Sequence, residues 1–256
     1  MNHPHLLSAS QVETFHRDGM IGPFQAMSPE EMATLRPEIE EALEKRSGLK
    51  ERERVHNLHL YEEVVMGLCR SSAVVDRIQC ILGDDLLLWR SNFFIKEPGG
   101  LEIPWHQDVN YWPIEPAIIC SAWMAIDDVD IENSCPNFIP GSHRRVIPHV
   151  TAGEDMSFHQ MADPKEVDAS KAVPFIMKPG EFVLFNERAL HQSNPNLSER
   201  RRMGLAIRTT VPQTRILDYD SDDHGVIQLC GNDPLKFNRH VVPRHLKESR
   251  LSLANA

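Results

Sequence analysis

The feature that most constrains the fold is a change in the apolar pattern at Gly83. Residues 61–82 carry valine, isoleucine and leucine at helical spacing, so we expect helix there, in two pieces broken near Ser71 and Ser72. After Gly83 come short runs rich in β-branched and aromatic residues, with no helical pattern between them. The expected strands are residues 86–89, 92–96, 118–126, 137–139, 175–177, 181–185 and 203–211. Many short strands without alternating helices predict a mainly β protein, an antiparallel double-sheet jelly roll with helices packed on one face.

Serine residues mark where the first helices should begin. Ser10 and a glutamate three residues later form a capping box, and Gly19 is expected to end this helix. Ser28 begins a second helix with a second capping box, and Pro37 within it should kink or interrupt it. Residues 47–57 are polar and are expected to form a solvated loop.

Length and composition favour a single domain. The chain has 256 residues, of which 41% are hydrophobic, and a barrel or sandwich of this size usually has one core. We expect one domain over 1–256. It would comprise a helical N-terminal part at about 8–83, a jelly-roll core at about 85–212 and a C-terminal extension at 213–256.

Charge and cysteine content limit the partners and the compartment. The formal net charge of −10 argues against nucleic acid as a partner, because phosphate binding requires a basic surface. The five cysteines show no paired spacing, which is typical of reduced thiols. No apolar run approaches the length of a membrane span, and the N-terminus lacks a secretory pattern. We therefore expect a cytoplasmic protein that acts on a small molecule, with no nucleic-acid or membrane partner.

Two candidate metal ligands, His106 and Asp108, are separated by one residue. On a strand, side chains two apart point to the same face, so the imidazole and the carboxylate would converge. His191, which follows a predicted buried strand, is the best candidate for a second histidine. Two histidines and one carboxylate with open positions are the ligand set of non-haem Fe(II) oxygenases.

The wider set of motifs resembles the phytanoyl-CoA dioxygenase family of Fe(II)- and 2-oxoglutarate-dependent oxygenases. The resemblance covers roughly residues 10–212 and follows the family's order. It implies a double-stranded β-helix core, the jelly roll also found in cupins, with Fe(II), 2-oxoglutarate and O2 as cofactor and cosubstrates. The motifs that carry it are Trp105-His106-Gln107-Asp108, Pro140-Gly141-Ser142-His143, His191-Gln192-Ser193 and Arg202.

The resemblance also implies how the cosubstrate is held. Arg202 lies eleven residues after His191, the family's spacing for the arginine that binds the far carboxylate of 2-oxoglutarate. The planar guanidinium suits that task because it pairs with a carboxylate through two donors. Ser193 matches the family's serine that bonds the same carboxylate, and Trp123 falls where the family places a pocket tryptophan. Gly204, on the face of the strand that carries Arg202, leaves room for a ligand.

The carboxylate at position 108 bears on the type of reaction. Some members of the family have alanine or glycine there, which opens a halide site and converts hydroxylation to halogenation. Because Asp108 is present, we expect a hydroxylase and not a halogenase. The resemblance implies oxidative decarboxylation of 2-oxoglutarate to succinate and CO2, coupled to hydroxylation of an unactivated C–H bond.

Other polar residues receive weaker expectations. His143 and His149 match family positions that are not ligands, and His56 and His59 are expected to be surface residues. Arg208 shares the parity of Arg202 along its strand, but a surface ion pair is the favoured interpretation.

Three features concern the surroundings of the site. Asn110 and Tyr111 directly follow the ligands and are candidates to border the substrate. Residues 151–172 form either a lid or a mobile surface loop. Ser134 stands where the family often has glycine, and Pro136 is added, so the shape of that loop should differ.

Several alternatives stay open. A serine hydrolase lacks the G-x-S-x-G elbow here, and a zinc hydrolase would not need the pair Arg202 and Ser193. A non-oxygenase, cupin-like metal-binding protein is a further alternative. For the substrate, a small metabolite (an amino acid, phosphonate, osmolyte or secondary-metabolite intermediate) is favoured over an acyl-CoA, because no basic nucleotide-binding patch is evident.

Overall fold

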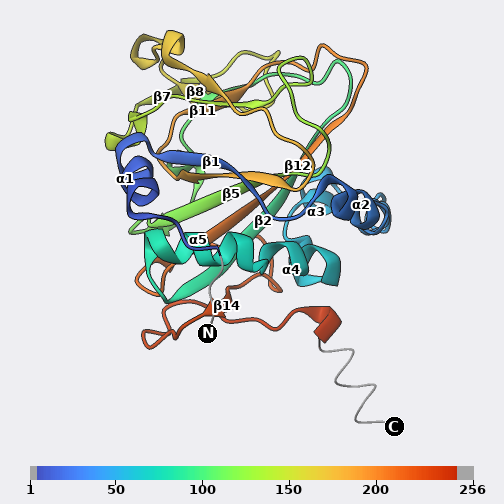
Figure 1. The fold of residues 1–256 in the computed structure, drawn as a ribbon, viewed down its shortest axis with the longest axis vertical. Coiled ribbons are helices and arrows are strands. Elements are labelled where there is room, and N and C mark those ends of the chain that lie inside the picture. Colours follow the sequence, from blue (N-terminus) through green and yellow to red (C-terminus); the bar gives the residue numbers. More distant parts are fainter. Residues whose placement is uncertain (1–4, 247–256) are drawn as a thin grey trace.

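The computed structural model describes residues 5–246 and contains two facing antiparallel sheets (Figure 1). The larger sheet has six strands in the order β1-β10-β5-β12-β2-β14, and the smaller has four in the order β3-β11-β6-β9. The strands of the larger sheet are β1 (Met20–Gln25), β10 (Glu181–Asn186), β5 (Ile119–Ala125), β12 (Arg202–Thr210), β2 (Leu86–Lys96) and β14 (Ile227–Cys230). Those of the smaller sheet are β3 (Ile103–His106), β11 (His191–Ser193), β6 (Pro136–Phe138) and β9 (Val173–Pro174).

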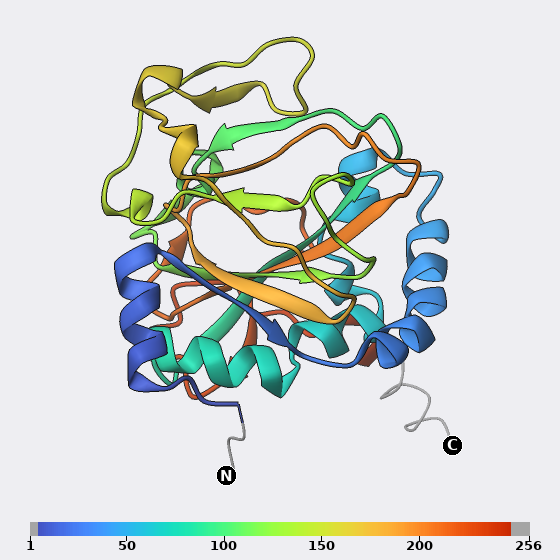
Figure 2. The same cartoon turned by 45° about the horizontal axis from the view of Figure 1, so that its top comes forward.

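Helices cover the outer face of the larger sheet. Figures 1 and 2 show α4 and α5 along that face, with α1 beside them and the β7–β8 pair on the far side of the molecule. The helices are α1 (Ala9–Asp18), α2 (Pro29–Glu44), α3 (Glu51–Val55), α4 (Glu63–Cys69) and α5 (Ser72–Leu82). The remaining strands form two small pairs, β4 (Ile114–Glu115) with β13 (Arg215–Ile216), and β7 (His149–Thr151) with β8 (Gln160–Ala162). This arrangement confirms the predicted jelly roll with helices on one face.

Strand alternation divides the core into two layers. Along β12, Met203, Leu205 and Ile207 point toward the helices and join the largest cluster of buried residues. The intervening Ala206 packs instead between the two sheets, in a second cluster. Because successive side chains of a strand face opposite sides, one strand contributes both to the helix-facing core and to the space between the sheets.

Several predicted boundaries hold. Gly19 follows α1 with φ 80°, in the left-handed region that favours glycine, and the Ser28 capping box begins α2. The long helical stretch is broken before Ser72, where α5 begins. The two expected strands before residue 97 merge into the single strand β2. Single-domain organisation over the whole chain stays a prediction.

Other local predictions were wrong. The predicted loop at 47–57 contains α3, and the strand expected at 175–177 is displaced to β9. Pro37 does not interrupt α2, which runs continuously through it. Met32 and Ile39 of that helix are fully buried, and each burial stabilises by roughly 1.5–3 kcal/mol, enough together to offset the roughly 3 kcal/mol that an interior proline costs.

The first helix begins at a different serine from the one predicted. Ser8 caps α1: its hydroxyl accepts from the Gln11 N–H at 3.3 Å, and the Gln11 side chain accepts from the Ser8 N–H at 2.9 Å. Ser10 lies inside the helix. Both serines match the capping-box pattern, and the burial of Leu7 just before Ser8 anchors the earlier start.

Among residues 5–246, none of the helices combines the length and the apolar character that a membrane crossing requires.

The corrected cap can be tested by two alanine substitutions. Ser8→Ala should lower the free energy of unfolding by about 1 kcal/mol, because it leaves an N-terminal N–H without its acceptor. Ser10→Ala, in the exposed first turn, is the matched control and should change it little. Urea unfolding followed by circular dichroism measures both, and a larger loss for Ser10→Ala would restore the original assignment.

Candidate active site

Antiparallel pairing of β3 and β11 brings the two histidines together. His191 is the direct register partner of His106, and their ring centroids are 4.0 Å apart. The His106 side chain is buried, with 3% of its surface exposed. Together with Asp108, the two offer ligand atoms that all lie within 4.8 Å of one another. The predicted ligand set is therefore assembled in space as three donors that could hold one metal ion.

Asp108 reaches this position differently from the way the strand pattern implied. β3 ends at His106, and Asp108 begins a short 3-10 helix, Asp108–Tyr111, yet its Oδ1 lies 3.8 Å from the His106 Nε2. The fully buried Gln107 anchors this turn. Its side chain donates to the carbonyls of Arg145 and Arg188 and accepts from the Ile147 N–H at 2.7 Å. The Asp108 carboxylate is therefore directed toward the histidines by this turn, and not by the alternation of side chains along a strand.

Backbone carbonyls orient both imidazoles. The Nδ1 of His106 lies 2.8 Å from the Pro104 carbonyl, and that of His191 lies 2.9 Å from the Ala189 carbonyl. A carbonyl only accepts, so each Nδ1 carries the proton and each Nε2 keeps its lone pair for a metal. These partners, each two residues before its histidine, are ones that the sequence alone did not identify.

The surroundings keep the two histidines neutral. Burial, followed by the neighbouring His191, lowers the pKa of His106 well below its ordinary value. Burial also lowers the pKa of His191, partly offset by Asp108. Only the neutral imidazole binds a metal, so protons compete little for these ligands near neutral pH. The donor set of two nitrogens and one carboxylate oxygen fits Fe(II) with positions left open.

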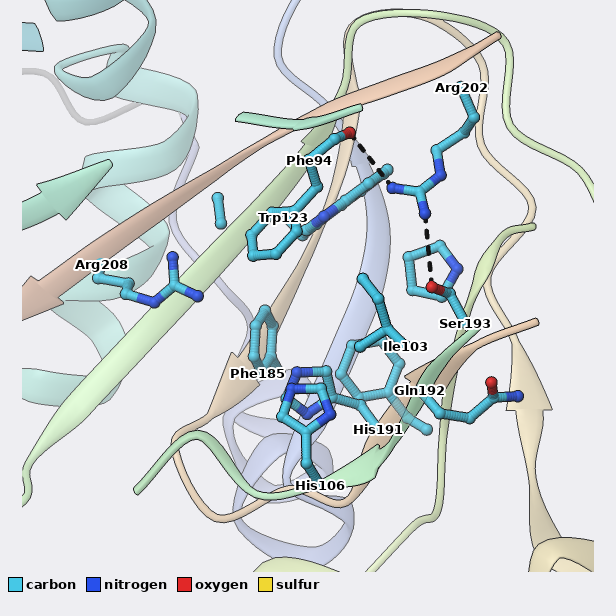
Figure 3. Close-up of a pocket in the computed structure, with 13 residues that line it drawn as sticks. Phe94, Ile103, His106, Trp123, Phe185, His191, Gln192, Ser193, Arg202 and Arg208 are labelled. Carbon is cyan, nitrogen blue, oxygen red and sulfur yellow. Dashed lines mark hydrogen bonds between the residues drawn. The ribbon is translucent and has the colours of Figure 1, made fainter. Parts of the chain in front are cut away.

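A buried cation lies at the opposite end of the same cavity (Figure 3). Arg202 is 1% exposed, and its guanidinium donates to the Ser193 Oγ and to the Phe94 carbonyl, both at 3.4 Å. Burial lowers the pKa of Arg202 to about 10, so it stays charged at neutral pH. Its Nε is buried and bonds to no other described residue. A buried guanidinium with free donor capacity suits the far carboxylate of 2-oxoglutarate.

Trp123 forms one wall of this cavity, as its predicted role requires. The Arg202 guanidinium lies 5.3 Å from the centroid of the indole ring. The ring takes the space above Gly204, where an added Cβ would come within 2.0 Å of the Trp123 Cζ2. Gly204 therefore makes room for the Trp123 side chain. It contributes to ligand space only indirectly, by allowing Trp123 to form this wall of the cavity.

Lys96 is a neighbour to which the sequence pattern gives no role, although it alternates with Asn92 and Phe94 on a strand of which one face is expected to line the cavity. Its ammonium is buried and donates to the Ser134 Oγ at 2.9 Å and to the carbonyls of Ser193 at 3.0 Å and Asn194 at 2.6 Å. Burial and then Arg202 lower the pKa of Lys96 to about 7. Ser134 adopts the left-handed conformation, with φ 80°, in the place of the family's glycine. The structure thus shows that the Lys96 side chain is buried beside Ser134 and Ser193.

The structure corrects three predicted surface residues. Arg208 is only 4% exposed, and its Nη2 lies 3.5 Å from the Asp108 Oδ2 beside the metal ligands. His59 is fully buried and bonds the Ser91 hydroxyl at 2.7 Å. His56 is half-buried and bonds Asn92. Strand parity correctly placed Arg208 inward, and the preference for a surface ion pair was wrong.

Of the two remaining candidates, one lines a second, outer cavity. Tyr111 lines it, and the Tyr111 hydroxyl donates to the Gln160 carbonyl at 2.7 Å. Asn110 instead faces His149, with 2.8 Å between its Nδ2 and the ring. Part of 151–172 covers the cavity, and the Phe158 ring lies 4.9 Å from that of His106. Whether this segment moves as a lid stays a prediction.

The fold and the site together have the form of an Fe(II)- and 2-oxoglutarate-dependent oxygenase. The family model described as phytanoyl-CoA dioxygenase (PhyH) matches residues 15–204. The chain therefore belongs to the phytanoyl-CoA dioxygenase family.

Individual relatives agree with that membership. A probable alpha-ketoglutarate-dependent hypophosphite dioxygenase of Stutzerimonas stutzeri is 31% identical over 183 residues, which are 70% of this chain and 60% of the relative. The peroxisomal phytanoyl-CoA dioxygenase of Homo sapiens is 25% identical over 148 residues, 54% of this chain and 43% of the relative. The chain spans about half the length of the curated relatives it matches.

Solved structures share the fold. CytC3 with Fe(II) and alpha-ketoglutarate superimposes with a TM-score of 0.74 at 26% identity, covering 93% of each chain. EctD from S. alaskensis with bound Fe superimposes with a TM-score of 0.69 at 22% identity, covering 82% of this chain and 79% of that one.

Metal binding tests the ligand set directly. His191→Ala should abolish tight Fe(II) binding, because it removes one of three convergent donors. His16→Ala, on the exposed face of α1, is the matched control and should bind as the unaltered protein does. Anaerobic calorimetric titration with Fe(II) measures both. Undiminished affinity in His191→Ala would rule out the proposed metal centre.

Packing around Trp123 gives a second test. Gly204→Ala should destabilise the protein by roughly 1–3 kcal/mol, because the new methyl group overlaps the indole ring, and should weaken 2-oxoglutarate binding by displacing that wall. Gly67→Ala is the control, since a Cβ there would meet no described atom within 4 Å. Urea unfolding and anaerobic titration with 2-oxoglutarate provide the two measurements. Equal stability of the two variants would contradict the packing argument.

Proposed function

We propose that the protein is an Fe(II)- and 2-oxoglutarate-dependent dioxygenase that hydroxylates an unactivated C–H bond of a small metabolite, releasing succinate and CO2. The observation that carries the proposal is the pairing of two sites in one cavity. Three convergent ligands, His106, Asp108 and His191, lie at one end, and the buried Arg202 lies at the other. A metal site alone does not require a buried guanidinium opposite it.

Different residues would hold the iron and the cosubstrate. His106, Asp108 and His191 would hold the iron, which when bound with 2-oxoglutarate supplies the oxygen-activating chemistry. Arg202 and Ser193 would fix the far carboxylate of the cosubstrate, and so the orientation of its keto acid toward the metal.

Aromatic rings line this cavity and would limit the access of water. Phe138 stacks on the His191 ring with 5.4 Å between centroids and 17° between planes, and the Phe185 centroid lies 5.1 Å from it. A dry, low-dielectric wall strengthens the charge pairing between Arg202 and a bound carboxylate. It also keeps reactive species away from solvent.

The intact carboxylate supports hydroxylation over halogenation. Asp108 is 5% exposed and lies beside both His106 and Arg208, where a halide would have to displace it to reach the metal.

The outer cavity supports a small substrate over an acyl-CoA ester. Its volume is about 490 Å³, within the range of sites for small ligands. The human relative is by description a phytanoyl-CoA dioxygenase, so an acyl-CoA 2-hydroxylase is the alternative within the family. We also propose a cytoplasmic location, supported by five cysteines that are all free.

The proposed reaction is tested by following the cosubstrate. With Fe(II) and O2, the protein should convert 2-oxoglutarate to succinate, faster when the correct metabolite is present. A zinc hydrolase or a non-catalytic cupin-like protein would form no succinate. Stimulation by acyl-CoA thioesters alone, across a panel that also holds small acids, osmolytes and phosphonates, would favour the alternative.

Asp108→Ala should reduce succinate formation by at least roughly 100-fold, because the iron loses its only anionic protein ligand. Asp84→Ala is the control, because Asp84 is an exposed aspartate between α5 and β2, and it should leave the rate unchanged. Adding chloride to Asp108→Ala and analysing the product by mass spectrometry separates loss of activity from a change to halogenation. Wild-type turnover by Asp108→Ala would refute the assignment of this carboxylate.

A further inference from the structure

The outer cavity lies beside the metal ligands and is separate from the cosubstrate pocket. Asp108 lines the outer cavity, whereas Arg208 and Phe94 line both spaces and so form the boundary between them. Figure 3 shows Arg208 on the side of the histidines away from Ser193. If the proposed function holds, on which this inference rests, the substrate must approach the metal from this outer cavity.

Arg208 is packed between two aromatic rings at that boundary and has donors without partners among the described residues. The centroid of the Trp112 ring lies 5.0 Å from its guanidinium carbon, and that of Phe94 lies 5.8 Å away. Its Nη2 lies 3.5 Å from the Asp108 Oδ2. The Nε and Nη1 atoms are buried, and neither bonds to any atom of the described residues. An arginine never loses its charge in a protein, so these N–H groups are donors that lack an acceptor among the described residues.

Metal binding at Asp108 would increase the need of Arg208 for an anionic partner. The Asp108 carboxylate is the anion nearest to Arg208 among the described residues that line the cavity. Once that carboxylate coordinates a divalent cation, most of its negative charge is drawn toward the metal. The buried guanidinium then keeps only Asp220, which is outside ion-pair contact, as a counter-ion among the described residues, and a buried charge without a contacting partner is unfavourable. A second anion beside Arg208 would restore the balance.

The rest of the cavity adds positive charge. Arg90 and Arg52 also line it, and both pair with the single carboxylate of Asp220, at 2.7 Å and 2.6 Å. The described lining thus holds three arginines and one carboxylate, that of Asp108, in a chain whose formal net charge is −10. A cationic cleft in an acidic protein concentrates small anions at the site.

The cavity also offers neutral polar atoms and an apolar wall. The Asn92 Oδ1 and the His56 Nδ1 are buried without a bond to a described residue. Burial lowers the pKa of His56 to about 4, so this ring is neutral at pH 7. The rings of Tyr111 and Phe158, 5.6 Å apart, also line the cavity. A ligand that fits has one charged end and an apolar body.

We infer that the substrate is a small organic anion whose carboxylate or phosphonate oxygens bind Arg208, while its apolar part lies against Tyr111 and Phe158. Arg208 would thereby select the substrate and set which carbon faces the metal. A purely positioning role, in which Arg208 only orients Asp108, would give no preference for anions.

Binding can be measured without turnover, in protein holding Ni(II) and 2-oxoglutarate so that the Arg202 site is already filled. The probes are benzoate and phenylphosphonate, with benzamide as the neutral partner of benzoate. Calorimetry at neutral pH should show saturable binding of at least one anion and at least tenfold weaker binding of benzamide. Arg208→Met should weaken anion binding by roughly 10- to 100-fold, the loss of one charge-assisted hydrogen bond.

Arg215→Met is the matched control, because Arg215 is an exposed arginine outside the cavity lining, and it should bind anions as the wild type does. Arg208→Lys keeps the charge and should keep part of the affinity. If Arg208→Met fails to fold or to bind Ni(II), the wild-type comparison of anion with amide still decides the question. Equal binding of benzamide, unchanged affinity in a folded Arg208→Met, or no binding of either anion at millimolar concentration would overturn the inference.

The two proposals fail in different ways. Anion binding that depends on Arg208, without any O2-dependent succinate formation, would leave the anion site standing and remove the oxygenase assignment. Succinate formation without a preference for anions would support the oxygenase assignment and remove the anion site.

Discussion

Antiparallel pairing of β3 with β11 is the interaction on which the site depends. It sets His191 directly opposite His106, although the two lie far apart in the chain. A backbone carbonyl then holds the Nδ1 of each ring, which leaves both Nε2 atoms free, and the Gln107 side chain anchors the turn in which Asp108 completes the set. A shift of this register by one residue would move one imidazole to the other face of its sheet and remove the site.

Strand β12 carries both arginines that line the cosubstrate pocket. Its outward-facing residues pack against the helices, and its inward-facing residues include Arg202 and Arg208, six positions apart. A buried guanidinium is unfavourable without acceptors or anions around it, which supports the proposal of one anion site beside each of the two arginines. The first fits the far carboxylate of 2-oxoglutarate, and the second lies on the other side of the metal ligands. Alternation turns both arginines to the inner face of β12, and their spacing along the strand separates the proposed cosubstrate site from the proposed substrate site.

Much of this could be predicted because it depends on local chemistry. The H-x-D pair, the distant His191 and the spacing to Arg202 are visible as residue types at set separations, and the jelly roll follows from short strands without intervening helices. Predictions that depended on competition between local and tertiary terms did less well. The sequence pattern predicts a cap at Ser10, whereas the burial of Leu7 favours a cap at Ser8. It also predicts a break at Pro37, whereas the buried face of that helix keeps it continuous.

By itself, the sequence determined the ligand types, the strand alternation and the membership of a family of oxygenases, because these depend on residue identity and periodicity. Only the tertiary structure decided which polar residues are buried together. The sequence marks Ser134 by its position and Arg208 by its parity, but the burial of both, and of Lys96, follows only from the closing of the sheets over them. Their roles arise from removal from water and from neighbours contributed by other strands, and neither is encoded in the residues adjacent in the chain.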